Sequence, residues 1–253
     1  MPVCVQIIDI FLYFDYFIIQ RVIMSMDISL QQANENAQRK FMAGVYQWMV
    51  VALAISGAVA WVVSGNAAFQ RVLFGNPFVF FALVIGELAL VWWLSATLHK
   101  ISVQAASIAF VAYSALNGLI LSSVFLMYTN ASITRIFLIT ALMFGGMSIY
   151  GMKTKSDLHS MARYLYMALI GVVIASLVNF FLRASVLDVI ISMVTVLVFT
   201  GLTAYDTQKL LSVANQADGS EQFKKVAIIG ALELYLDFIN IFLALLRLFG
   251  RRN

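Results

Sequence analysis

The sequence has 253 residues, of which 62% are hydrophobic and 11% charged. Soluble domains are about 25% charged and about 45–50% apolar, so this composition excludes an ordinary soluble enzyme and indicates a polytopic membrane protein. One cysteine, Cys4, excludes an internal disulfide, and two histidines, His99 and His159, are too few for a zinc cluster. The net charge of +4 comes without the lysine-rich runs of a nucleic-acid-binding protein.

The first 40 residues differ from the rest and are predicted to form an N-terminal leader. Within residues 1–26, the stretch Ile7–Met24 is short, aromatic and interrupted by three charged residues. It lacks the basic start, clean apolar core and cleavage site of a signal peptide. We therefore expect translation to begin at Met24 or Met26, and a short interfacial helix is the alternative.

From residue 41 onward, six apolar segments are long enough to cross roughly 30 Å of hydrocarbon at about 1.5 Å per residue. They are Ala43–Val63, Phe78–Leu98, Val103–Tyr128, Ile136–Met152, Tyr164–Leu182 and Val189–Tyr205. A seventh, Val226–Leu246, is equally apolar apart from its acids. Residues 41–253 are therefore predicted to form one all-α transmembrane domain, a seven-helix bundle.

Two spans carry small or polar residues at helical spacing. Ser107, Ser114 and Asn117 lie at i, i+7 and i+10, on one face of the third helix. Hydrogen bonding between helices is the favoured interpretation, and pore lining is the alternative. Small residues recur every three positions from Gly145 to Gly151, which predicts close packing rather than catalysis. No histidine lies inside a span to act as a base, so we expect neither an enzyme nor a cofactor.

Carboxylates inside the spans are the main functional signal. Glu233, Asp237 and Asn240 lie at i, i+4 and i+7 of the last segment, which places them on one helical face. Asp206 lies at the end of the preceding segment, and Glu87 lies near the middle of the second. A carboxylate at the centre of a spanning helix costs about 2.5–3.5 kcal/mol, so it normally faces a protein interior or a water-filled pathway.

A structural interpretation of the same acids is the alternative. Asp206 would then pair with Lys209 at the helix end, and Glu233 would bond to tyrosine or serine neighbours. We favour a functional role because intramembrane acids usually mark ion or proton pathways.

The distribution of basic residues predicts a cytoplasmic N-terminus. Nine lysines and arginines fall on the predicted cytoplasmic side: Arg39, Lys40, Lys100, Lys153, Lys155, Arg163, Lys209, Lys224 and Lys225. The opposite loops carry Arg71, Arg135 and Arg183. Seven full crossings would also place the arginines of the tail, residues 247–252, outside. A re-entrant final segment that returns to the cytoplasm would remove this conflict.

Two motifs resemble the Bax inhibitor-1 family, specifically its bacterial inner-membrane branch. They are Thr203-Ala-Tyr-Asp-Thr-Gln208 and Leu234-Tyr-Leu-Asp-Phe-Ile-Asn-Ile-Phe-Leu243. Shorter matches to the same branch are Ser148-Ile-Tyr-Gly151, Ala168-Leu-Ile-Gly171 and Ala175-Ser-Leu-Val-Asn179. The resemblance covers the chain from about Phe41 to its end. It implies a bacterial inner-membrane protein whose last helix is surrounded by the other six.

The resemblance also implies a pH-sensitive calcium leak channel, with the bilayer, Ca²⁺ and protons as partners. The family's pH-sensing aspartate pair falls on Asp206 and Asp237, which are also the candidate Ca²⁺ ligands, and Glu87 matches an acid in helix two of some members. In one member a basic residue near the end of helix two holds the sensor closed. Here that region reads Leu98-His-Lys100, so Lys100 or His99 is the candidate. The alternative function is an interaction protein that modulates a membrane-bound protease, as another bacterial member does.

Overall fold

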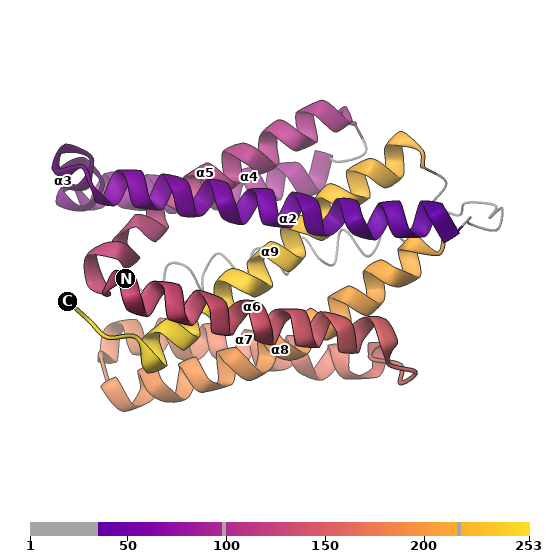
Figure 1. The fold of residues 1–253 in the computed structure, drawn as a ribbon. Helices are drawn as coiled ribbons and strands as arrows, with labels where there is room; N and C mark the ends of the chain where they lie inside the picture. Colours follow the sequence, from indigo (N-terminus) through magenta and orange to yellow (C-terminus); the bar gives the residue numbers. More distant parts are fainter. Residues whose placement is uncertain (1–34, 98–99, 217–218) are drawn as a thin grey trace.

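The structure is a computed structural model that describes residues 35–97, 100–216 and 219–253 (Figure 1). The predictions for residues 1–26 and for His99 lie outside this range. The described residues form eight helices and no β-strand. The helices are α2 (Glu35–Ser64), α3 (Ala67–Gly75), α4 (Pro77–Thr97), α5 (Val103–Met127), α6 (Asn130–Lys153), α7 (His159–Leu182), α8 (Ser185–Ala214) and α9 (Glu221–Phe249).

All seven predicted spans are helical, and six helices in the described part of the chain are long and apolar enough to cross a membrane. The remaining span, α4, has a shorter apolar stretch, Phe81–Leu94, with Glu87 inside it. The fold is therefore an all-α polytopic membrane protein. Several helices extend beyond the predicted spans. In particular, α2 begins inside the predicted leader, and α8 continues beyond Tyr205 to Ala214.

The short helix α3 was not predicted, because only nine residues form it. The side chain of Asn66 caps its start by accepting hydrogen bonds from the backbone N–H groups of Ala68 and Phe69. This cap satisfies N–H groups that a helix start otherwise leaves unpaired. Helix α3 thus closes the connection between α2 and α4 at one end of the bundle (Figure 1).

Helix α9 occupies the centre of the bundle. Of the 18 consecutive residues that form its most apolar stretch, 89% are buried inside the protein. It packs mainly against α2, α5, α6 and α8, whereas α4 packs mainly on α5 and α7 mainly on α8. The last helix is therefore enclosed, as the resemblance implies, but α4 and α7 hold outer positions.

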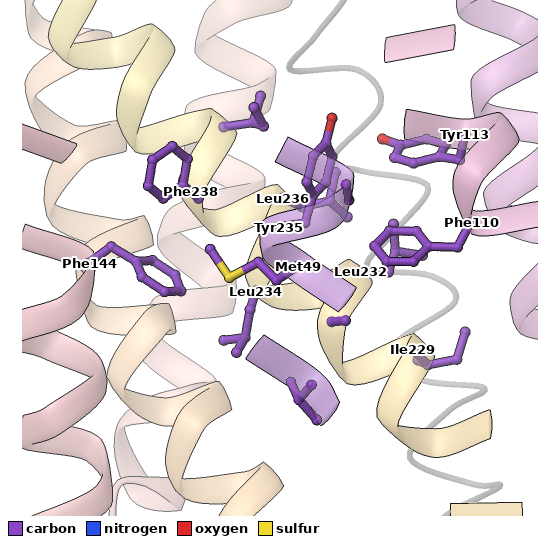
Figure 2. Close-up of a cluster of buried hydrophobic side chains, with 14 of the residues drawn as sticks. Met49, Phe110, Tyr113, Phe144, Ile229, Leu232, Leu234, Tyr235, Leu236 and Phe238 are labelled. Carbon is purple, nitrogen blue, oxygen red and sulfur yellow. The ribbon is translucent and has the colours of Figure 1, made fainter. Parts of the chain in front are cut away.

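Aromatic side chains fill the space around α9 (Figure 2). The ring of Tyr235 makes edge-to-face contacts with Phe110 and Tyr113 of α5, at centroid distances of 6.2 and 6.0 Å. Phe238 contacts Phe144 of α6 at 5.7 Å. Such pairs contribute roughly 0.5–1.5 kcal/mol each beyond the area that they bury. These contacts fix which face of α9 meets α5 and which meets α6.

The C-terminal tail is hydrogen-bonded to the connection between α5 and α6. The backbone N–H of Thr129 donates to the carbonyl of Arg251 at 3.0 Å. The N–H of Arg251 donates to the hydroxyl of Ser132 at 2.9 Å. Because α9 is an unbroken helix of 29 residues that ends at this connection, its course favours a full crossing over the re-entrant alternative.

One predicted close approach holds α6 against the helix that carries Asp206. A Cβ atom added at Gly151 would lie 2.3 Å from the carbonyl oxygen of Ala204 on α8. No residue with a side chain fits there, so glycine allows the two backbones to touch. At Gly145 nothing lies within 4 Å of such a Cβ, so the predicted close packing is confirmed at Gly151 and wrong at Gly145.

Candidate functional site

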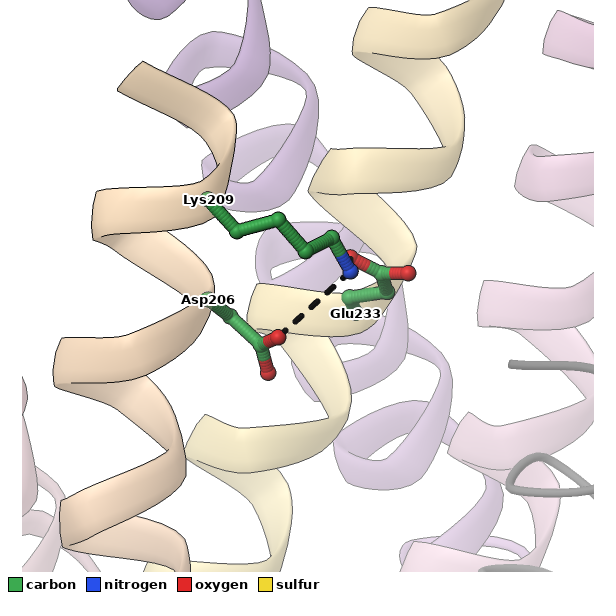
Figure 3. A network of polar contacts seen from close by, with 3 residues as sticks. All are labelled: Asp206, Lys209 and Glu233. Carbon is green, nitrogen blue, oxygen red and sulfur yellow. Dashed lines mark hydrogen bonds and ion pairs between the residues drawn. The ribbon is translucent and has the colours of Figure 1, made fainter. Parts of the chain in front are cut away.

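Four ionisable side chains meet between α8 and α9, and Figure 3 shows three of them, Asp206, Lys209 and Glu233. The Nζ of Lys209 lies 2.8 Å from Oε2 of Glu233 and 3.6 Å from Oδ1 of Asp206. The side chain of Asp206 also interacts with that of Asp237 across the two helices. We call Asp206, Lys209, Glu233 and Asp237 the carboxylate–lysine cluster. Asp206, Lys209 and Asp237 are 5%, 5% and 4% exposed, so the cluster lies inside the protein.

Helical spacing explains how this cluster forms. Asp206 and Lys209 are three residues apart on α8, and Glu233 and Asp237 are four apart on α9, so each pair shares a face of its helix. The structure thus brings together three of the predicted site residues. It also contains the Asp206–Lys209 pair of the structural interpretation, although Glu233 bonds to Lys209 rather than to tyrosine or serine.

Lys209 is the site residue that the sequence analysis misplaced. It was counted among the charges of the cytoplasmic loop because the sixth segment appeared to end at Tyr205. Helix α8 continues for more than two turns beyond that point, so Lys209 lies inside the helix and is buried. Its position three residues after Asp206 was the signal that could have placed it in the site.

The charges of the cluster do not balance if every carboxyl group is ionised. Three carboxylates would then share one ammonium group in a region with little access to water. Two ionised carboxylates that face each other there would repel, so a proton on Asp206 or Asp237 would relieve the repulsion. Neutrality of this site therefore requires protons or a further cation.

A second polar cluster lies on another face of α9. The hydroxyl of Tyr235 donates to Oδ1 of Asn117 on α5 at 3.0 Å and lies 2.7 Å from Oγ of Ser56 on α2. The same Ser56 hydroxyl lies 2.7 Å from the carbonyl of Ser114. These bonds confirm the favoured interpretation of the α5 stripe at Asn117, because they join three helices.

Glu87 of α4 belongs to this second cluster rather than to the first. It is fully buried beside the side chain of Asn117. Neither of its oxygens meets hydrogen-bond geometry with another described residue. We call Ser56, Glu87, Asn117 and Tyr235 the tyrosine–glutamate cluster. Residues two apart on a helix point about 200° apart, so Tyr235 and Asp237 direct the two clusters to different sides of α9.

Two further predicted site residues are Asn240 and Lys100. The side chain of Asn240 is buried, and its amide donates to the carbonyl of Leu236 on its own helix at 3.0 Å. Lys100 is exposed at the turn after α4. The basic group beside Asp206 in this structure is therefore Lys209 and not the predicted Lys100.

The described residues do not contain a preformed metal site. No group of three or more histidine, cysteine, aspartate or glutamate side chains in that part of the chain could hold a metal ion. The Lys209 ammonium lies among the carboxylates instead, at the position where a cation would be attracted.

Gln208 joins the site to the loop between α6 and α7. Its Oε1 accepts a hydrogen bond from the backbone N–H of Leu158 at 2.9 Å, and its Nε2 donates to the carbonyl of Ser156 at 2.9 Å. Gln208 is two residues from Asp206, so movement of α8 at the cluster would also move this loop. The sequence analysis quoted Gln208 only as part of a motif.

The fold and these clusters define a class of protein: a polytopic α-helical membrane protein whose central helix carries buried acids. The family described as "Inhibitor of apoptosis-promoting Bax1" matches residues 38–253, and the chain belongs to this Bax inhibitor-1 family.

Proteins from several bacteria are similar to this chain over most of its length. The chain is 50% identical to the inner membrane protein YbhL of Escherichia coli strain K12, over 84% of this chain and 92% of the relative. It is 42% identical to an uncharacterised protein of Borreliella burgdorferi, over 90% and 99% of the two chains. A protein of Deinococcus radiodurans is 40% identical, over 92% and 98%. The likeness to YbhL and the apolar helices support a multi-pass protein of the inner membrane.

Proposed function

We propose that this protein is a pH-sensitive leak pathway for Ca²⁺, a transport protein rather than an enzyme. The observation that carries the proposal is the buried carboxylate–lysine cluster at the interface of α8 with the central helix α9. Acids buried inside a membrane protein are costly, and they usually mark an ion pathway or a proton relay. Ca²⁺ prefers oxygen ligands, and carboxylates supply them.

In this proposal, protons and Lys209 set how tightly α8 holds α9. With one proton shared, Asp206 and Asp237 are joined by a hydrogen bond across the two helices. With both ionised, the two carboxylates repel each other and attract a cation. Lys209 or Ca²⁺ can provide that cation, so proton concentration and Ca²⁺ act on the same interface.

Glu87, Glu233 and Asn240 are proposed to line the ion pathway, with Glu233 on the side of the sensor pair and Glu87 on the other side of α9. Glu87 lies on α4 and faces the second side of α9, so a pathway that uses it passes between α9 and the α4–α5 pair. Anionic oxygens there would replace part of the hydration shell of an ion in a low-dielectric interior.

The test is Ca²⁺ flux through purified protein in liposomes that contain a calcium dye. Asp237→Asn and Glu233→Gln should lose most of the flux, because each removes an anionic oxygen from the cluster. Matched controls are Asp188→Asn and Glu221→Gln, exposed acids on the same two helices, which should keep native flux. Unchanged flux in Asp237→Asn and Glu233→Gln would contradict the proposal and favour modulation of a membrane-bound protease, an activity that requires a partner.

We also propose that the N-terminus is cytoplasmic. The loops after α6 and after α8 lie at the same end of the bundle (Figure 1). Lys153 ends α6, Lys155 lies in the loop that follows it, and Lys224 lies in the first turn of α9. Single cysteines at Ser156 and at Ser220 should both react with a membrane-impermeant thiol reagent from the cytoplasmic side only. Reaction from the outside would reverse the orientation.

A further inference from the structure

Three arginines from distant parts of the sequence gather where the tail meets α6. Arg135 lies in the second turn of α6, and Arg251 and Arg252 belong to the tail. All three line one recess of about 560 Å³, together with Thr129 and Ser132. The backbone of Arg251 accepts a hydrogen bond from the N–H of Thr129 and donates one to the hydroxyl of Ser132, and these bonds hold the tail there. Figure 1 shows the C-terminus beside the start of α6.

These guanidinium groups are exposed, and none forms an ion pair with an acid in the described part of the chain. Asp188 of α8 lines a neighbouring cavity with Arg247 and Arg252 and accepts a hydrogen bond from Asn179. The recess therefore has an excess of positive charge at one end of the bundle. Guanidinium groups bind phosphate oxygens through paired hydrogen bonds, which a lysine cannot do.

An apolar groove continues from this recess along α6. Arg135 and Ala131 line both cavities, and beyond them the groove is lined by Leu138, Ile139 and Leu142. These three residues lie at i+3, i+4 and i+7 from Arg135, so they follow it on one face of the helix. At about 1.5 Å per residue, Leu142 lies roughly 10 Å deeper than Arg135 along the helix axis. Leu138 and Leu142 are 58% and 77% exposed.

We propose that this surface is a binding site for an anionic phospholipid. The phosphate group lies against Arg135, Arg251 and Arg252, and one acyl chain follows Leu138, Ile139 and Leu142. Bulk lipid explains the apolar face of α6 alone, but it does not explain three arginines brought together at its end by a hydrogen-bonded tail. In the proposed orientation these arginines also oppose the usual charge distribution, and a lipid phosphate would offset their charge.

The experiment measures phosphatidylglycerol and phosphatidylcholine of identical acyl chains bound to the purified full-length protein by native mass spectrometry. Phosphatidylglycerol should be preferred. Each of Arg135→Gln and Arg251→Gln should reduce the preference by about fivefold, since a basic residue near an anionic headgroup contributes about 1 kcal/mol. Arg71→Gln, an exposed arginine of α3 at the same end of the bundle, should leave the preference unchanged.

Two further measurements keep the proposal falsifiable. Arg135→Lys keeps the charge but loses the paired hydrogen bonds, so it should reduce the preference by less than Arg135→Gln does. Inorganic phosphate should not displace the lipid at millimolar concentration, because it lacks the acyl chain. The proposal fails if the native protein does not prefer phosphatidylglycerol to phosphatidylcholine, or if Arg71→Gln reduces this preference as much as Arg135→Gln does. It also fails if inorganic phosphate displaces all of the bound lipid.

Discussion

The ammonium group of Lys209 on α8 lies 2.8 Å from the carboxylate of Glu233 on α9. Lys209 also lies 3.6 Å from Asp206 on its own helix, so one positive charge serves carboxylates from both sides of the interface. Buried ion pairs of this type add little net stability compared with apolar residues, but losing one partner is costly because a charge is left uncompensated. Replacement of Lys209 should therefore disturb the interface between α8 and α9 more than replacement of any other residue of the cluster.

Replacement of Lys209 by methionine should lower the free energy of unfolding by about 3–5 kcal/mol, because Glu233 and Asp206 lose their cation inside the protein. Unfolding of the purified protein in mixed detergent micelles would measure this change. The control is Lys224→Met, an exposed lysine at the start of α9, which should change stability by less than about 0.5 kcal/mol.

The double variant Lys209→Met with Glu233→Gln separates the contribution of the ion pair to stability from the contribution of side-chain packing. Removing both charges should recover part of the stability lost in Lys209→Met, giving a coupling energy of about 0.5–3 kcal/mol. Purely additive losses would show that the 2.8 Å contact does not contribute as an ion pair.

Sequence reasoning located the helices well and the partners of the buried acids only in part. Runs of apolar residues long enough to span a bilayer identify helices without any tertiary information, and all seven were found. Helical spacing likewise placed Glu233 and Asp237 on one face. The end of α8 was placed too early because Asp206 and Lys209 interrupt the apolar run, although the two are buried and form an ion pair at 3.6 Å.

Which acids face each other could not be predicted from spacing, because it depends on how the helices pack. Glu87 appeared to belong with the aspartates, but α4 packs on α5 and directs Glu87 toward Asn117. The role of Tyr235 was also missed. Its hydroxyl bonds to α2 and α5, and nothing local in the sequence shows which residues of those helices it meets.

Replacement of Gly151 by alanine should destabilise the protein by about 1–3 kcal/mol, because the added Cβ would lie 2.3 Å from the carbonyl oxygen of Ala204 and must push α6 away from α8. Gly145→Ala is the matched control on the same helix. It meets open space and should be neutral or stabilising by up to about 1 kcal/mol, since alanine favours the helix. Equal effects of the two changes in an unfolding measurement would contradict the close contact.

Removal of the Tyr235 hydroxyl in Tyr235→Phe should lower stability by about 1–3 kcal/mol. The change keeps the ring contacts with Phe110 and Tyr113 but takes the hydrogen-bond donor away from Oδ1 of the buried Asn117. Tyr164→Phe on α7, where the side chain is 71% exposed, provides the control and should have almost no effect. Thermal unfolding in detergent would compare the two.

Ca²⁺ flux through the native protein should change with pH between about 5.5 and 8.5, the range in which a carboxyl group in a poorly solvated site can titrate. In the proposed mechanism Asp206 and Asp237 titrate as a pair, because the protonated carboxyl group of one donates a hydrogen bond to the carboxylate of the other. Asparagine keeps the shape of the side chain but cannot gain or lose a proton there. Flux should therefore become nearly independent of pH in Asp206→Asn and in Asp237→Asn.

Asp188→Asn on α8 is the control, because it removes an acid from the same helix but outside the carboxylate–lysine cluster. This acid is exposed and accepts a hydrogen bond from Asn179 through Oδ1, an atom that asparagine retains. The dependence of Ca²⁺ flux on pH in Asp188→Asn should match that of the native protein. If Asp206→Asn and Asp237→Asn also keep the native profile, the pair is not the sensor, and the hydrogen bond between α8 and α9 has a structural role alone.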